Sequence, residues 1–67
     1  MQKWEYIKVA RSLNGGFFID STGVERVNID AERLVDMMNL MGKDGWELIN
    51  AIKDENGFYF FKRPVQE

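Results

Sequence analysis

The chain of 67 residues allows one domain, residues 1–67, and no separate linker. It contains no Cys and no His, which excludes disulfides, thiolate zinc sites and histidine-based catalysis. Its net charge of −2, with charges of both signs well mixed, argues against general nucleic-acid binding. No stretch is long and apolar enough to span a membrane, and the N-terminus lacks the apolar region of a signal peptide. We therefore expect a cytoplasmic protein.

The size of the chain favours association with other subunits. A domain this small buries only roughly 60% of its extended surface, so its core is marginal. Small domains compensate with disulfides, a bound metal or a partner subunit. Because Cys and His are absent, a partner subunit is the remaining route, and the aromatic content of 13% fits an apolar surface made for another chain. We expect a homo-oligomer that binds no metal and no cofactor.

The first third of the chain predicts two strands. Trp4 to Ser12 is rich in strand-forming residues, and its alternation sends apolar side chains to both faces, as in a central strand that is covered on both faces. Leu13-Asn14-Gly15-Gly16 predicts a turn, and Phe17 to Asp20 a short second strand. A second turn is predicted at Ser21-Thr22-Gly23. Residues 24–28 alternate poorly, and the sequence does not decide between a short strand and a loop there.

One helix is predicted, from Asp30 to Asp44. Asp30 is a good N-cap residue, because its carboxylate can accept hydrogen bonds from the free N–H groups of the first turn. Gly45 is expected to end the helix in the left-handed conformation. Gly42 then lies in the last turn, where the lack of a side chain permits close packing. A core stripe at helical spacing comprises Ala31, Leu34, Val35, Met38 and Met41, and Met37 and Leu40 widen it.

The last third of the chain predicts a β-hairpin. Trp46 to Lys53 and Phe58 to Arg63 flank Asn56-Gly57, a pair typical of a two-residue type I′ turn. In that register Ile52 faces Phe61 and Glu55 faces Phe58. One face then carries Trp46, Leu48, Ile52, Tyr59 and Phe61, and the other carries Ile49, Ala51, Phe58 and Phe60. The predicted fold is α+β: an antiparallel sheet of three to four strands with one helix packed on one face, in the order β-β-α-β-β.

Three blocks of the sequence carry a family resemblance. They are Trp4-Glu5-Tyr6, the run Gly45-Trp46-Glu47-Leu48-Ile49 three residues after Gly42, and the closing Phe61-Lys62-Arg63-Pro64. With these blocks the chain resembles a small bacterial and phage family catalogued as domain of unknown function four-one-seven-seven. The resemblance covers the first strand and the half from the helix to the C-terminus. It implies a β-α-β-β core, and it implies no activity and no functional residue.

Catalysis has little support in the sequence. The hydroxyls of Ser12, Ser21 and Thr22 have no His to activate them. The pair Asp54-Glu55 is better explained as a solvated hairpin end, and the acidic residues lack the spacing of a magnesium site. The glycine-rich turn at residues 13–16 does not begin a helix, so it is not a phosphate-binding loop of the usual kind. We expect that the protein is not an enzyme.

Basic and aromatic residues interleave on the predicted strands and their flanks. The basic residues are Lys3, Lys8, Arg11, Lys53, Lys62 and Arg63, and the aromatic residues are Trp4, Tyr6, Phe58, Tyr59, Phe60 and Phe61. Aromatic platforms beside cations bind nucleotides and single strands. A core and a subunit interface with solvated cations at the rim explain the same pattern.

Three functions therefore compete. The first is a non-enzymatic interaction protein that binds through its apolar sheet or helix surface. The second is a binder or sponge of a small anionic, nucleotide-type ligand between subunits. In that reading Arg11, Lys62 and Arg63 pair with phosphate, and Trp4, Tyr6 and Tyr59 stack on the base. Binding of single-stranded nucleic acid is the third choice, and the net negative charge disfavours it.

Overall fold

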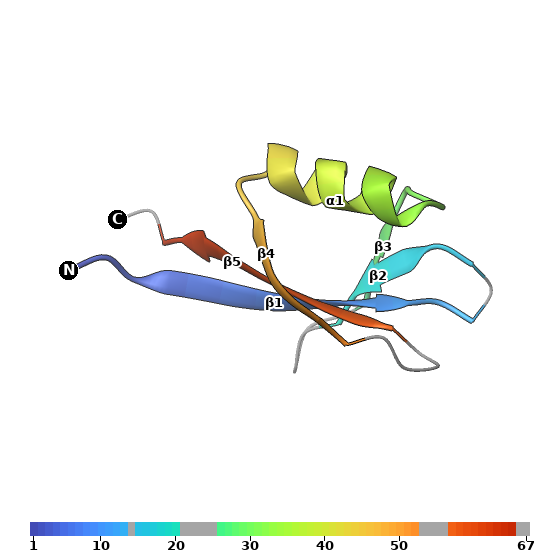
Figure 1. The fold of residues 1–67 in the computed structure, drawn as a ribbon, viewed down its shortest axis with the longest axis horizontal. Coiled ribbons are helices and arrows are strands. Elements are labelled where there is room, and N and C mark those ends of the chain that lie inside the picture. Colours follow the sequence, from blue (N-terminus) through green and yellow to red (C-terminus); the bar gives the residue numbers. More distant parts are fainter. Residues whose placement is uncertain (14, 21–25, 53–56, 66–67) are drawn as a thin grey trace.

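The part of the chain that the structure describes folds into a single five-stranded sheet with one helix. The structure is a computed structural model that describes residues 1–13, 15–20, 26–52 and 57–65. The elements are β1 (Trp4–Arg11), β2 (Phe17–Ile19), β3 (Val27–Ile29), α1 (Leu34–Lys43), β4 (Glu47–Ile52) and β5 (Phe58–Pro64). The sheet is antiparallel with the strand order β3-β2-β1-β5-β4, and α1 lies over one face (Figure 1). The α+β class is confirmed. The predicted three to four strands and the order β-β-α-β-β are wrong, because residues 27–29 form a strand of their own.

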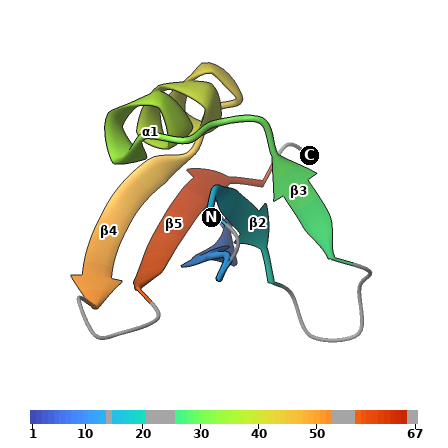
Figure 2. The same cartoon turned by 90° about the vertical axis from the view of Figure 1, so that its right-hand side faces the viewer.

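The hydrophobic core lies between α1 and the sheet. Strand alternation directs Ile7 and Val9 of β1, and Tyr59 and Phe61 of β5, to this side. The buried members of the core are Val9, Phe17, Met37, Met41, Tyr59 and Phe61. Figure 2 shows α1 on this side of the sheet, with no second helix on the opposite face of the part that the structure describes. The central position predicted for the first strand is confirmed. The predicted cover on both of its faces is wrong, because Trp4 and Tyr6 on the face away from α1 are exposed.

The helix is shorter than predicted at its N-terminus. Its N-cap residue is Arg33, which has an extended backbone and makes no capping hydrogen bond with its side chain. The prediction of Asp30 as the N-cap is wrong, because β3 continues to Ile29, which pairs with Phe17, and residues 30–33 lead from the sheet to the helix. The predicted core stripe is also rotated. Met37 is fully buried, whereas Val35 is 57% exposed.

The C-terminus of α1 ends in a Schellman motif. The N–H of Trp46 donates to the carbonyl of Met41 at 3.0 Å, and the N–H of Gly45 donates to the carbonyl of Gly42 at 3.0 Å. Gly45 has φ +88°, which confirms the left-handed conformation predicted for it. The close packing predicted at Gly42 is wrong, since among the described residues no heavy atom outside the helix backbone and the two chain neighbours lies within 4 Å of the position that a Cβ would take there.

Replacing Gly45 with alanine is expected to destabilise the fold by about 1 kcal/mol, because an L side chain is disfavoured at positive φ. Apart from Gly45 and its two chain neighbours, no heavy atom of the described residues lies within 4 Å of the new Cβ, so the expected loss comes from backbone strain. Gly42→Ala is the matched control. It lies in the helix and should be neutral or stabilising by up to about 1 kcal/mol. Urea denaturation of both variants checks the opposite signs. Equal effects would contradict the role assigned to Gly45.

The C-terminal hairpin has a different register from the predicted one. Ile52 pairs with Phe58, so the connection spans residues 53–57 and the two-residue turn is wrong. A bulge lies between Leu48 and Asn50, and it leaves Ile49 46% exposed. Ile52 is therefore opposite Phe58, away from the core, although it was predicted on the face of Phe61. Asn56 and Glu55 of the predicted turn lie outside the described residues, and Gly57 has φ +62°.

The turn predicted between the first two strands is confirmed. The N–H of Ser12 donates to the carbonyl of Gly16 at 2.9 Å, and Gly15 and Gly16 both have positive φ. Asn14 and the second predicted turn, Ser21-Thr22-Gly23, lie outside the described residues. Within the described ranges, no helix is long and apolar enough to span a membrane.

Candidate functional site

The sheet face away from α1, here called the open face, carries a group of aromatic side chains. The register places Tyr6 opposite Lys62 and Lys8 opposite Phe60 at its centre. Ile52 and Phe58 face each other beside them. By alternation along the paired strands, the open face comprises Trp4, Tyr6, Lys8, Ala10, Phe18, Asn28, Glu47, Asn50, Ile52, Phe58, Phe60, Lys62 and Pro64.

The open face has large apolar side chains that the chain itself leaves in contact with solvent. Trp4 is 42% exposed, Tyr6 64% and Ile52 45%. Single exposed apolar residues are common on proteins, but contiguous apolar patches mark interaction sites. Trp4 and Tyr6 lie on β1 and Ile52 lies on β4, and Phe58 and Phe60 of the intervening strand β5 lie on the same face between them. This arrangement favours a binding surface rather than scattered exposure.

The lysines of the open face already have partners within the chain. Lys8 Nζ lies 3.2 Å from the Asp20 carboxylate and 5.0 Å from the centroid of the Phe58 ring. Lys62 Nζ lies 4.3 Å from the Trp4 ring, and Glu47 is its partner across the strands. Lys8 is thus close to both a carboxylate and an aromatic ring, and Lys62 is close to an aromatic ring and has an acidic residue opposite it in the register.

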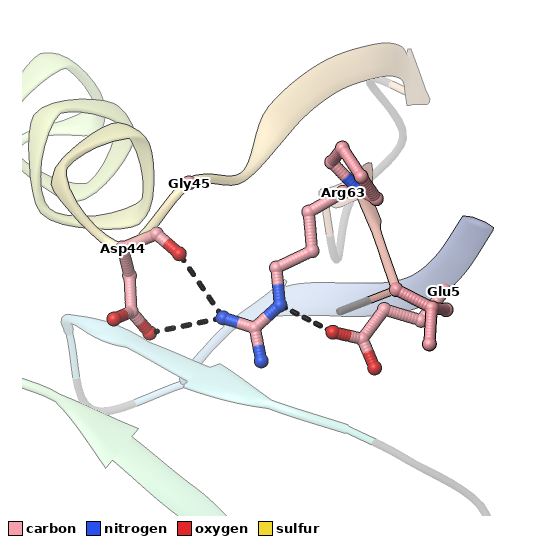
Figure 3. A pocket seen from close by; sticks show the side chains of 6 residues that line it. Glu5, Asp44, Gly45 and Arg63 are labelled. Carbon is pink, nitrogen blue, oxygen red and sulfur yellow. Dashed lines mark hydrogen bonds and ion pairs between the residues drawn. The ribbon is translucent and has the colours of Figure 1, made fainter. Parts of the chain in front are cut away.

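Arg63 lies on the other side of the sheet and binds three parts of the fold together. Figure 3 shows its guanidinium between Asp44 and Glu5. Nε donates to Glu5 Oε1, and Nη1 donates to the main-chain carbonyl of Asp44 at 3.0 Å and lies 3.5 Å from its carboxylate. The guanidinium carbon also lies 4.2 Å from the Trp46 ring. Arg63 therefore joins β5 to β1 and to the C-terminus of α1.

The hollow beside Arg63 does not favour an anion. It measures about 530 Å³ and is lined by Glu5, Asp44, Gly45, Arg63, Pro64 and Val65. Both carboxylates of this set contact the guanidinium, and the negative end of the α1 dipole points to the same place. The role of phosphate ligand predicted for Arg63 has no support from this geometry.

The six predicted ligand residues do not form one site. Trp4, Tyr6 and Lys62 share the open face. Tyr59 is only 6% exposed, and its ring meets the ring of Phe17 edge-on at 6.0 Å, so it offers no free face to a base. Arg11 lies at the opposite end of β1 from Trp4, with its guanidinium 5.4 Å from the ring of Phe17.

The structure adds functional candidates that the sequence interpretation missed. Arg26 lies over the ring of Phe18, with its guanidinium carbon 3.7 Å from the ring centroid, and Asp20 pairs with Lys8. Side chains alternate along a strand, so Phe18 points to the face opposite that of its neighbour Phe17. This alternation is the signal that could have placed Phe18 on the open face. No such signal existed for Arg26, because its segment had no clear strand pattern.

The arrangement is suited to non-covalent binding. Aromatic surface, cation–π contacts and charge-assisted hydrogen bonds are its chemical resources. Within residues 1–13, 15–20, 26–52 and 57–65, no group of three or more acidic side chains is placed to hold a metal ion. The acidic pair Asp54-Glu55, considered for acid–base chemistry, lies outside these residues.

Comparison with known proteins returns no relative. No family model matches the chain, and no curated protein or solved structure matches it at a significant level. The resemblance to domain of unknown function four-one-seven-seven therefore stays a prediction. The function has to be argued from the geometry of the molecule itself.

Proposed function

We propose that this chain is a non-enzymatic interaction protein that forms a homo-oligomer, with the open face as the interface between copies. The observation that carries the proposal is the exposure of Trp4, Tyr6 and Ile52 on one face of the sheet. Aromatic residues of this kind are enriched at protein interfaces, where they bury a large area with little loss of conformational entropy. A second copy would cover them.

The dimensions of the molecule allow such an interface. Its principal extents are 40, 25 and 20 Å, so a sheet face can supply the roughly 800 Å² per partner that a standard interface buries. Association would also add to the stability that the small core provides, because a partner that binds only the folded state stabilises that state. An interface between folded chains would therefore stabilise the fold of each subunit.

The charge pattern favours a second copy over a highly charged partner. Lys8 lies on the central strand β1, and Lys62 lies on its neighbour β5. Glu47 lies on β4 at one side, and Asp20 follows β2 at the other. A two-fold axis through the centre would bring lysines of one copy towards carboxylates of the other. Twofold interfaces require such self-complementarity. The interleaved carboxylates oppose a nucleic-acid backbone, which needs a surface of one sign.

Tyr6→Glu is expected to dissociate the oligomer, because it places a carboxylate within the apolar part of the interface. The folded subunit should tolerate the change, since Tyr6 is exposed and the new carboxylate would lie opposite Lys62. Light scattering at micromolar concentration should give at least twice the chain mass for the unmodified protein and the chain mass for the variant. Native mass spectrometry gives the same count and detects any captured partner.

Val35→Glu is the matched control. Val35 and Tyr6 are both largely exposed, at 57% and 64%. Val35 lies on α1, on the other side of the sheet from Tyr6. This variant should keep the mass of the unmodified protein. A monomeric unmodified protein would overturn the proposal. Dissociation by Val35→Glu with no effect of Tyr6→Glu would move the interface to the helix and overturn the assignment to the open face.

A further inference from the structure

The two edges of the described sheet differ in how well they are protected against pairing with another strand. The edge strands are β4 and β3, which lie at opposite sides of the sheet in Figure 2. β3 has only three residues, and Arg26 and Asp30 flank it. β4 has six residues, of which five are exposed, and Glu47 is its only charge. Because short length and charges are the usual protection of an edge, β4 is the less protected of the two.

The main-chain groups of Ala51 face the free side of β4. The carbonyl of Gly57 accepts a hydrogen bond from the N–H of Arg11, so Gly57 is directed to β1 and the next residue, Phe58, is directed to β4. Phe58 pairs with Ile52, and Ala51 precedes Ile52 in β4. Since successive residues of an antiparallel strand direct their N–H and C=O groups to opposite sides, Ala51 directs both groups away from β5.

A local hydrogen bond occupies the donor at this edge. The N–H of Ala51 donates to Oδ1 of Asn50 at 2.9 Å, and the bond is exposed. Such bonds between a side chain and the neighbouring main chain compete with sheet pairing. A strand that pairs with β4 therefore has to displace the Asn50 side chain, which makes the pairing weak and dependent on concentration.

The edge of β4 is complementary to itself. About a two-fold axis at Ala51, the N–H of each copy reaches the carbonyl of the other, and the small Ala51 side chains permit close approach. Asn50 to Ile52 lie after the bulge in regular register with β5, and three paired residues also join β3 to β2. Glu47 precedes Ala51 by four residues in each copy, so the two carboxylates are about 26 Å apart at ~3.3 Å per residue and do not oppose each other.

We propose that β4 of one copy pairs antiparallel with β4 of a second copy, which joins two five-stranded sheets into one of ten strands. The two-fold axis is perpendicular to the sheet, so both open faces lie on the same side and stay accessible. The contact uses main-chain groups of the edge, and it does not depend on the contact between open faces. It is smaller than a standard interface, so we expect a Kd of about 0.1–1 mM.

Sedimentation of the Tyr6→Glu variant between about 10 μM and 1 mM tests the proposal without the contact between open faces. The mass should rise from that of one chain to that of two. In NMR spectra, exchange of the Ala51 amide proton with solvent should slow as the dimer forms. A monomer at every concentration would overturn the proposal. This result is independent of the oligomeric state of the unmodified protein, so failure of the edge contact and failure of the open-face contact can be told apart.

Ile49→Lys, added to Tyr6→Glu, should abolish the dimer, because lysine on an edge strand opposes pairing. Ile49 is 46% exposed, so the fold should tolerate the change. Val27→Lys is the matched control, since Val27 is 50% exposed on the opposite edge strand, and it should keep the dimer. Ala51→Pro should abolish the dimer as well, because it removes the outward N–H and leaves the bonds to β5. Association that survives Ile49→Lys, or that only Val27→Lys abolishes, would overturn the proposal.

Asn50→Ala tests the competing bond in the same background. It frees the N–H of Ala51 and should tighten dimerisation by about threefold or more. Weaker dimerisation would place the Asn50 side chain in the contact and overturn the pairing at Ala51. Native mass spectra of the unmodified protein in which a foreign chain is bound, and is lost with Ile49→Lys, would assign this edge to another protein and overturn the proposal.

Discussion

Phe61→Ala is expected to lower the free energy of unfolding by about 3–5 kcal/mol, the usual range for a buried phenylalanine. Phe61 is 1% exposed and lies opposite Ile7 of β1 and Leu48 of β4. It belongs to the same cluster as Met37 and Met41, so its loss leaves a cavity between the sheet and α1. A domain of 67 residues has a total stability of roughly 3–10 kcal/mol, so the variant should be largely unfolded or close to it.

Phe60→Ala is the matched control for this variant. Phe60 is the neighbouring residue of the same strand, but it lies opposite Lys8 on the open face and is only partly buried. Its replacement should cost clearly less than that of Phe61. Urea denaturation at one fixed protein concentration measures both, because association makes the apparent stability depend on concentration. An equal or larger loss for Phe60→Ala would contradict the position of the core.

Arg63→Ala is expected to destabilise the fold by about 1–2 kcal/mol. Hydrogen bonds to charged groups contribute about 1.5–3 kcal/mol, and the partial exposure of the pair reduces this contribution. The side chain of Arg63 is 33% exposed, that of Glu5 43% and that of Asp44 76%. The variant also loses the contact with the Trp46 ring and a cation at the negative end of the α1 dipole. In a domain of this size each kcal/mol lowers the Tm by about 4–8 °C, so thermal denaturation will resolve the loss.

Two further variants separate geometry from charge at this position. Arg63→Lys keeps the positive charge but loses the planar fork that reaches Glu5 and the Asp44 carbonyl together, so it should recover only part of the stability. Arg33→Ala removes an exposed arginine that has no ion pair among the described residues and should change little. Weakened binding of adenosine monophosphate by Arg63→Ala, with no change in melting temperature, would restore the ligand role predicted from sequence.

Local patterns in the sequence determined much of the secondary structure. Alternation and strand-forming residues predicted the strands that became β1, β2 and β5, and glycine chemistry predicted the turn after β1 and the left-handed Gly45. These features depend on the conformational preferences of neighbouring residues, so a single sequence contains the information. The sequence also showed that both faces of the sheet carry apolar residues. In the structure α1 covers one of these faces, and the other is the open face.

Tertiary structure alone decided the features that depend on residues far apart in the chain. Residues 27–29 became a strand because β2 offers them an edge to pair with, although their own alternation is poor. The hairpin pairs Ile52 with Phe58 and has a bulge between Leu48 and Asn50, so its register departs from the one that the local turn signal predicts. Arg63 meets Glu5 across 58 residues and Asp44 across 19, so its structural role could not be predicted from its neighbours in sequence. The stacking of Arg26 on Phe18 likewise exists only because folding brings the two side chains together.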